Sequence, residues 1–278
     1  MSQLRERFIR DLTIRNYSPS TIKSYVSALS CLGQRYKRCP SQITAEQIKQ
    51  YLDELVKAKK SWSTINIVIS SINRFYIETL GKDYSIERQK RPKKQSKLPC
   101  ILSKEEVNRI ISVHKNIKHR LILMTIYSAG LRIGELCRLK LTDIDSARMR
   151  IKIRNAKGHK DREVILSKIL LEELREYYKK IHPKTYLFNG WKATRSIAVS
   201  TVRHIFNQAI KKCNIKKEVT PHSLRHSFAT HLMDNGIDMR IIQSMMGHKS
   251  LKTTMIYCHL TEGKYGDIKS PLDDMSLN

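Results

Sequence analysis

The chain has 278 residues and is strongly basic, with 53 Lys and Arg residues against 25 Asp and Glu residues and a formal net charge of +28 at pH 7. This excess indicates a polyanionic partner, with nucleic acid ahead of a membrane surface, because no stretch is apolar enough to span a bilayer. The length allows two domains, and a domain of ordinary size within it can bury a real core.

Cysteine usage and the N-terminus indicate the compartment. The six cysteines are scattered and include no C-x-x-C pair, so neither a zinc site nor a disulfide framework is predicted. The first residues, M-S-Q-L-R-E-R-F-I-R, lack the apolar core of a signal peptide. We therefore expect a cytoplasmic protein with reduced thiols and no metal.

The first eighty residues predict helices only. Apolar residues recur at helical spacing in four segments, which begin near Leu4, at Ser18, at Thr44, and at Ser61 or Ser63. Four short helices with basic outer faces would make a small bundle, and we assign residues 1–87 to this first domain.

A basic stretch follows the bundle and predicts a linker over residues 88–100. From Glu87 to Cys100 the chain reads E-R-Q-K-R-P-K-K-Q-S-K-L-P-C, with six basic residues, one acidic residue and two prolines. Such a run is usually solvated, but a tether between two DNA-binding lobes can lie against phosphates. The residues expected to contact DNA are Arg88, Lys90, Arg91, Lys93, Lys94 and Lys97.

The rest of the chain, residues 101–278, predicts mainly helices around one β-hairpin. Residues 104–140 have a helical pattern with a break at Gly130, and 167–181 and 199–212 are helical again.

The hairpin is the one convincing β signal. Arg148 to Arg154 alternates strictly, with Met149, Ile151 and Ile153 on one face, and the turn N-A-K-G-H-K leads into a second strand from Glu163 to Leu166. Lys157 lies at the hairpin tip. The short apolar piece Tyr186–Phe188 has no assigned place.

The most informative stretch runs from Thr220 to His259. Thr220 and Pro221 mark a helix start, and His222 and Arg225 share a face of its first turn. His248 follows the next helix end at Gly247, and Ser250 can cap a last short helix that carries Tyr257.

Two imidazoles, a guanidinium and a phenol directed at one spot suit a phosphodiester. The guanidinium can hold two non-bridging oxygens, and a tyrosine can attack phosphorus. Each residue alone has a simpler interpretation: a structural histidine, a half-buried tyrosine or a solvated arginine. The hypothesis of a site therefore depends on the ordered set.

Two segments, H-S-L-R-H-S-F-A-T-H-L and M-M-G-H-K-S-L-K-T-T-M-I-Y-C-H, closely resemble the C-terminal signature of the tyrosine recombinases, the phage-integrase, Xer and Cre family. Y-S-A-G-L-R-I-G-E-L-C-R-L at 127–139 is similar to that family's first arginine box, with Ala129 where many members have Thr. The resemblance covers essentially the whole chain and lies nearest the compact Xer-like members. It implies a mainly α (α+β) fold, in which a helical SAM-like core-binding domain precedes a mostly helical catalytic domain with a small antiparallel sheet.

The resemblance also implies DNA transesterification without a cofactor or metal. Tyr257 would be the nucleophile and form a 3′-phosphotyrosine; the implied supporting set is Arg132, Arg225 and His248 on the phosphate, His222 as base, Lys157 as general acid and Glu135 behind them. A phenol with a pKa of about 10 is only about 0.1% ionised at pH 7, so it needs a base and positive surroundings. The implied partners are double-stranded DNA at a specific site and three further copies, joined through the C-terminal tail.

Two alternatives remain at this point. A type IB topoisomerase would use nearly the same chemistry, but the helical first domain and compact length fit a site-specific recombinase better. A non-catalytic DNA-binding regulator would explain the charge but not the order Arg–Lys–His-x-x-Arg–His–Tyr. Chromosome resolution and mobile-element integration both stay open as the natural task.

Overall fold

The computed structural model describes residues 2–82, 99–154, 161–192, 194–247 and 254–255. The chain divides into two compact units, Met1–Ser96 and Lys97–Asn278. The division falls within the predicted linker, whose residues 88–98 lie outside the described ones. The linker and the exact domain bounds therefore stay predictions.

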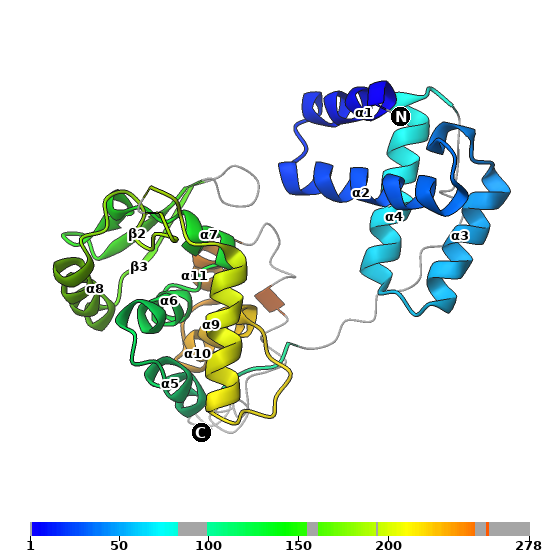
Figure 1. The fold of residues 1–278 in the computed structure, drawn as a ribbon. Helices are drawn as coiled ribbons and strands as arrows, with labels where there is room; N and C mark the ends of the chain where they lie inside the picture. Colours follow the sequence, from blue (N-terminus) through cyan, green and yellow to red (C-terminus); the bar gives the residue numbers. More distant parts are fainter. Residues whose placement is uncertain (1, 83–98, 155–160, 193, 248–253, 256–278) are drawn as a thin grey trace, which may run out of the picture. The chain divides into compact units, whose positions relative to one another are not determined.

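The described part of the first unit contains helices and no strand (Figure 1), as its sequence predicts. Its elements are α1 (Ser2–Ile14), α2 (Pro19–Tyr36), η1 (Pro40–Gln42), α3 (Ala45–Lys57), α4 (Trp62–Arg74) and the π-helical turn η2 (Phe75–Thr79). Ser18, Thr44 and Ser61 each cap a helix, because their side-chain oxygens accept the backbone N–H three residues on. The fourth helix thus begins after Ser61 and not after Ser63.

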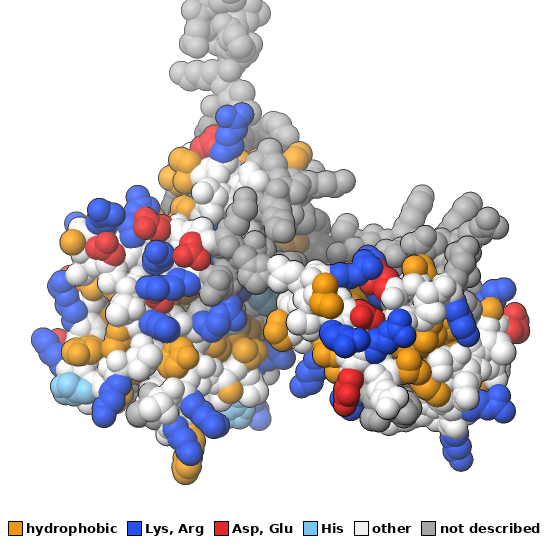
Figure 2. Space-filling view, turned by 90° about the horizontal axis from the view of Figure 1, so that it is seen from above, with side chains coloured by type: hydrophobic (Ala, Val, Ile, Leu, Met, Phe, Trp, Pro, Cys, Tyr) orange, Lys and Arg blue, Asp and Glu red, His pale blue; other side chains and the backbone are white. Residues whose placement is uncertain are grey.

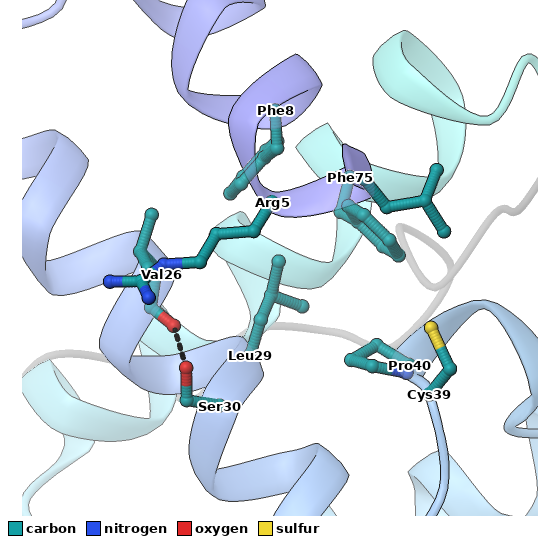
Figure 3. Close-up of a pocket in the computed structure, with 9 residues that line it drawn as sticks. Arg5, Phe8, Val26, Leu29, Ser30, Cys39, Pro40 and Phe75 are labelled. Atoms are coloured by element: carbon teal, nitrogen blue, oxygen red, sulfur yellow. Dashed lines mark hydrogen bonds between the residues drawn. The ribbon is translucent and has the colours of Figure 1, made fainter. Parts of the chain in front are cut away.

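The helices of the first unit enclose their own apolar core. Phe8, Leu12, Leu32, Ile48 and Ile72 are almost completely buried. A cavity of about 40 Å³ remains at the rim of this core and is drawn in Figure 3; its lining comes mainly from α1, α2 and Phe75. That volume corresponds to the space of only a few water molecules.

The second unit is mostly helical around a small sheet. Its elements are α5 (Lys104–Ser112), α6 (Ile117–Ser128), α7 (Ile133–Arg138), η4 (Leu141–Asp143), β1 (Ile144–Asp145), β2 (Arg150–Ile153), β3 (Arg162–Ile165), α8 (Lys168–Ile181), α9 (Val199–Lys212), α10 (Pro221–Asp234) and α11 (Met239–Met246). In Figure 1 the sheet and α8 lie on one side of this unit, and α9 lies on the other. Helix α6 is central, since it packs against α5, α7, α8, α9 and α10.

The prediction of helix throughout 104–140, broken only at Gly130, is wrong at one further place. Residues 113–116 separate α5 from α6, because the Asn116 side chain accepts the N–H groups of Lys118 and His119 and starts a new helix. The break at Gly130 is confirmed, and this glycine has a φ of +59°.

The antiparallel hairpin is confirmed, with a shorter first strand than predicted. The strand starts at Arg150, because Met149 has a φ of +53° and belongs to the preceding turn. The third strand, β1, was not predicted; its Ile144 pairs with Ile151 in a sheet of order β1-β2-β3. Tyr186–Phe188 now has a place, since the Leu187 N–H donates to the Leu139 carbonyl at 2.8 Å.

Helix α11 brings the ends of several elements together. It packs against both β3 and α10, and its residues Ile242 and Met246 form a small core with Phe228, Ala229 and Met233 of α10. Its C-terminal turn ends at Gly247, which has a φ of +59°. Within the described ranges, no helix combines the length and apolarity that crossing a bilayer requires.

Candidate active site

Arg132 occupies the N-cap of α7 and presents its guanidinium beside Glu135. Its backbone N–H donates to Glu135 Oε2 at 2.9 Å, and its Nη1 donates to Glu135 Oε1 at 2.8 Å. Its Nη2 makes a long contact of 3.4 Å with the Gly247 carbonyl. A quarter of the Arg132 side chain remains exposed, so the guanidinium can still reach a ligand.

Glu135 lies buried at the centre of three guanidinium groups. Besides Arg132, Arg162 donates from Nη1 to Oε1 and from Nη2 to Oε2, both at 2.8 Å, and Arg225 Nη1 lies 3.7 Å from Oε2. Burial alone would raise the pKa of Glu135, but the hydrogen bonds and charges of Arg162 and Arg132 outweigh it and lower this pKa to about 2. The carboxylate is therefore ionised at neutral pH.

Arg225, in the first half of α10, is only 4% exposed. Its Nη1 donates to the Gly130 carbonyl at 2.5 Å, and its Nη2 donates to the Met246 carbonyl. These bonds connect α10 to the end of α6 and to the end of α11. They hold the guanidinium in one orientation before any ligand binds.

His222 lies one turn before Arg225 and is exposed. The protein atoms around its ring, followed by the charges of Arg225, Arg132 and Arg203, lower the pKa of His222 below its ordinary value. The lowered pKa favours the neutral ring, which can accept a proton.

The charges of this site favour an anion. Three guanidinium groups against one carboxylate leave two positive charges, fixed in place by protein hydrogen bonds. Fixed positive charge of this kind stabilises a phosphate that gains negative charge in its transition state. On the face of the molecule that Figure 2 shows, Lys and Arg side chains are more frequent than Asp and Glu side chains.

The structure brings four of the predicted site residues together: Arg132, Glu135, His222 and Arg225. The others lie outside the described residues, and their roles stay predictions; they are Lys157, His248 and Tyr257, with the linker residues Arg88, Lys90, Arg91, Lys93, Lys94 and Lys97. Gly247, whose carbonyl contacts Arg132, immediately precedes His248 in the chain.

Two residues of the site were not predicted. Arg162 follows the hairpin loop as one basic residue among many, and only the fold shows that it pairs with Glu135. His226 lies next to Arg225 in α10, and burial together with His222 and Arg225 lowers its pKa to about 4. Among the described side chains, no group of three His, Cys, Asp or Glu residues is placed to hold a metal ion.

Comparison with known proteins identifies the family. The phage integrase family matches residues 101–264, and its N-terminal SAM-like domain matches residues 4–86. The chain belongs to the phage integrase family. The tyrosine recombinase XerA of Pyrococcus horikoshii is 37% identical over 94% of this chain and 90% of its own length.

Solved structures agree with this membership. A crystal structure of XerA recombinase covers 94% of each chain at 32% identity, with a TM-score of 0.55. A lambda integrase dimer bound to a COC′ core site has a TM-score of 0.75 at 19% identity, over 92% of this chain and 94% of that one, and supports the fold alone. The predicted fold class and the prediction of a tyrosine recombinase are confirmed, against the topoisomerase and regulator alternatives.

Proposed function

We propose that this recombinase cleaves and rejoins DNA strands at a specific site through a covalent 3′-phosphotyrosine. The Tyr257 oxygen attacks the scissile phosphorus while His222 takes the phenol proton. The bond from phosphorus to the 5′ oxygen breaks, and Lys157 protonates that oxygen. A 5′-hydroxyl of the partner strand then reverses the step, so the energy of the phosphoester bond is kept and neither ATP nor a metal is required.

The observation that supports this proposal most is the convergence of Arg132 and Arg225 on one buried carboxylate. Their guanidinium groups are held by Glu135 and by main-chain carbonyls before substrate binds. A phosphodiester placed over them would receive hydrogen bonds that strengthen as its oxygens gain charge. His248 would add a third donor.

The proposal also includes the assembly: four copies of the chain bind two paired DNA sites. The protein would act in the cytoplasm. The net charge of +28 supports duplex DNA as the partner here. The basic linker would lie along the phosphates. The C-terminal tail, residues 268–278, would dock on a neighbouring copy and couple their active sites.

The first experiment finds the site. The purified protein is incubated with sheared DNA of its source organism and denatured, the covalent protein–DNA complexes are collected, and their 3′ ends are sequenced. We expect the ends to cluster at one short sequence. Adducts at random positions would refute cleavage at a specific site, and the absence of adducts would refute the covalent step.

The second experiment tests the nucleophile on a nicked suicide duplex built from that sequence. Tyr257→Phe should bind this duplex normally and form no covalent band in a denaturing gel, because only the nucleophilic oxygen is lost. Tyr178→Phe is the matched control: it removes an exposed phenol of the same unit and should form the adduct like the unaltered protein. An adduct with Tyr257→Phe would exclude Tyr257 as the nucleophile.

A further inference from the structure

All three guanidinium nitrogens of Arg162 donate hydrogen bonds to other groups of the protein. Its Nη1 and Nη2 donate to the two oxygens of Glu135, and its Nε donates to the Met245 carbonyl at 2.7 Å. The side chain is 9% exposed. Arg162 therefore joins three elements, β3, α7 and α11, and is not placed to bind a ligand itself.

The end of α11 is held by three different arginines. Three consecutive carbonyls, those of Met245, Met246 and Gly247, contact Arg162, Arg225 and Arg132 respectively. The last carbonyls of a helix lack partners within the helix and carry the negative end of its dipole, so cations bind them well. The two arginines proposed to bind the phosphate thus share one anchor with Arg162.

Gly247 shows how closely Arg162 fits against this helix end. A Cβ added at Gly247 would lie 3.1 Å from Arg162 Cδ and 3.3 Å from its Nε. The glycine also has the positive φ that ends the helix. The same residue therefore turns the chain and leaves room for the arginine.

Glu135 has only two oxygens, and the two arginines share them unequally. Arg162 binds both oxygens with its fork, while Arg132 reaches the carboxylate with one guanidinium nitrogen and its backbone N–H. Without Arg162, the carboxylate would be open to a bidentate pair with Arg132, the preferred geometry of such pairs. That pair would engage a second guanidinium nitrogen of Arg132, whose side chain is now a quarter exposed.

We propose that Arg162 is a positioning residue for strand cleavage: it occupies Glu135 and holds the end of α11, so that Arg132 keeps guanidinium N–H groups available for the scissile phosphate. This inference rests on the proposed function. It assigns Arg162 no contact with the phosphate.

The test compares Arg162→Gln and Arg162→Lys with the unaltered protein on the suicide duplex. Both variants should bind the duplex within about twofold and cleave it about 10-fold to 100-fold more slowly in a single turnover, the range of a misplaced catalytic contact. Lysine should not rescue the rate, because an ammonium group lacks the planar fork that now binds both Glu135 oxygens and the Met245 carbonyl in a fixed geometry.

Arg120→Gln is the matched control, because it breaks another Arg–Glu pair of the same unit, with Glu173. It should cleave at close to the unaltered rate. Circular dichroism checks that every variant is folded. If Arg162→Gln unfolds, Arg162→Lys still tests the proposal, because its positive charge stays beside the buried Glu135 carboxylate. An unaltered cleavage rate in Arg162→Lys would overturn the proposal.

A second readout does not depend on cleavage. In protein with 13C-labelled glutamate carboxyls, Glu135 should stay ionised down to about pH 2 and should protonate at a clearly higher pH in Arg162→Lys. An unchanged titration would overturn the role of Arg162 even if cleavage slows. If the unaltered protein forms no adduct, both the proposed function and the positioning role are refuted. If it forms the adduct and the Arg162 variants cleave at the same rate, only the positioning role is refuted.

Discussion

Replacing Gly130 with alanine tests how tightly the site is packed behind Arg225. Gly130 ends α6 with a φ of +59°, and an added Cβ would lie 2.5 Å and 2.7 Å from two atoms of the Phe228 ring. Phe228 is 5% exposed and is packed in the same small core as Met246. The ring cannot move aside without disturbing the helix end that Arg225 holds.

The expected loss has two parts. The left-handed backbone costs a non-glycine residue about 1–2 kcal/mol, and overpacking a filled core costs about 1–3 kcal/mol. The free energy of unfolding should therefore fall by about 2–5 kcal/mol. Gly236→Ala is the matched control, because Gly236 has a φ of +80° and no atom within 4 Å of an added Cβ; it should show the backbone part alone.

Urea unfolding followed by circular dichroism measures both variants. Gly130→Ala should also cleave the suicide duplex more slowly, because the Gly130 carbonyl accepts a hydrogen bond from Arg225. Equal destabilisation of the two variants would refute the predicted clash with Phe228.

Three further predictions concern charge. The pKa of Glu135 falls from 4.5 to about 2 on folding, so its stabilisation of about 3 kcal/mol is complete above about pH 4.5 and is lost as the pH falls toward 2. About 2 kcal/mol of it should be lost between pH 6 and pH 3 in unfolding measurements, and this loss should be absent from the pH dependence of Glu135→Gln. Lys157→Ala should slow cleavage by about 10²–10⁴-fold, and a 5′-bridging sulfur, whose departure requires no proton, should restore most of the rate; without rescue, Lys157 is not the acid. Lys93→Gln with Lys94→Gln should flatten the slope of log affinity against log salt by about one to two units, and an unchanged slope would place the linker in solvent.

Local signals made much of the fold predictable from the sequence. Ser18, Thr44, Ser103 and Ser167 each cap a helix through a bond to a backbone N–H three residues away. Such caps depend on neighbouring residues only, so a sequence pattern is sufficient to find them. The same holds for the alternation of Ile151 and Ile153, which are both buried.

Features that depend on distant partners were missed or misjudged. Strand β1 has two residues, too few for any alternation, and exists because Ile144 pairs with Ile151. Met149 continued the alternating pattern of its strand, yet it lies in the turn. Arg162 carries no local signal, because its partners Glu135 and Met245 are 27 and 83 residues away in the chain.

The roles proposed for the site residues come from the resemblance, but the reason for an acidic residue at Glu135 required the structure. Three guanidinium groups close together would repel one another, and one of them, Arg225, is buried. The Glu135 carboxylate and the carbonyls of Gly130 and Met246 compensate that repulsion and still leave two positive charges. The charge that a phosphate would need is therefore in place before DNA binds, with no cost of reorganisation during the reaction.

The burial of each charged residue in this cluster determines whether a substitution there affects folding stability as well as ligand binding. Removing Glu135 or Arg225 leaves an uncompensated buried charge, which costs about 3–5 kcal/mol of folding stability. Slower cleavage by a variant at either residue would therefore result partly from unfolding. Arg132 differs because a quarter of its side chain is exposed and water can replace part of what it loses. Arg132 is therefore the position of this cluster at which a substitution would separate the proposed binding of phosphate from the stability of the fold.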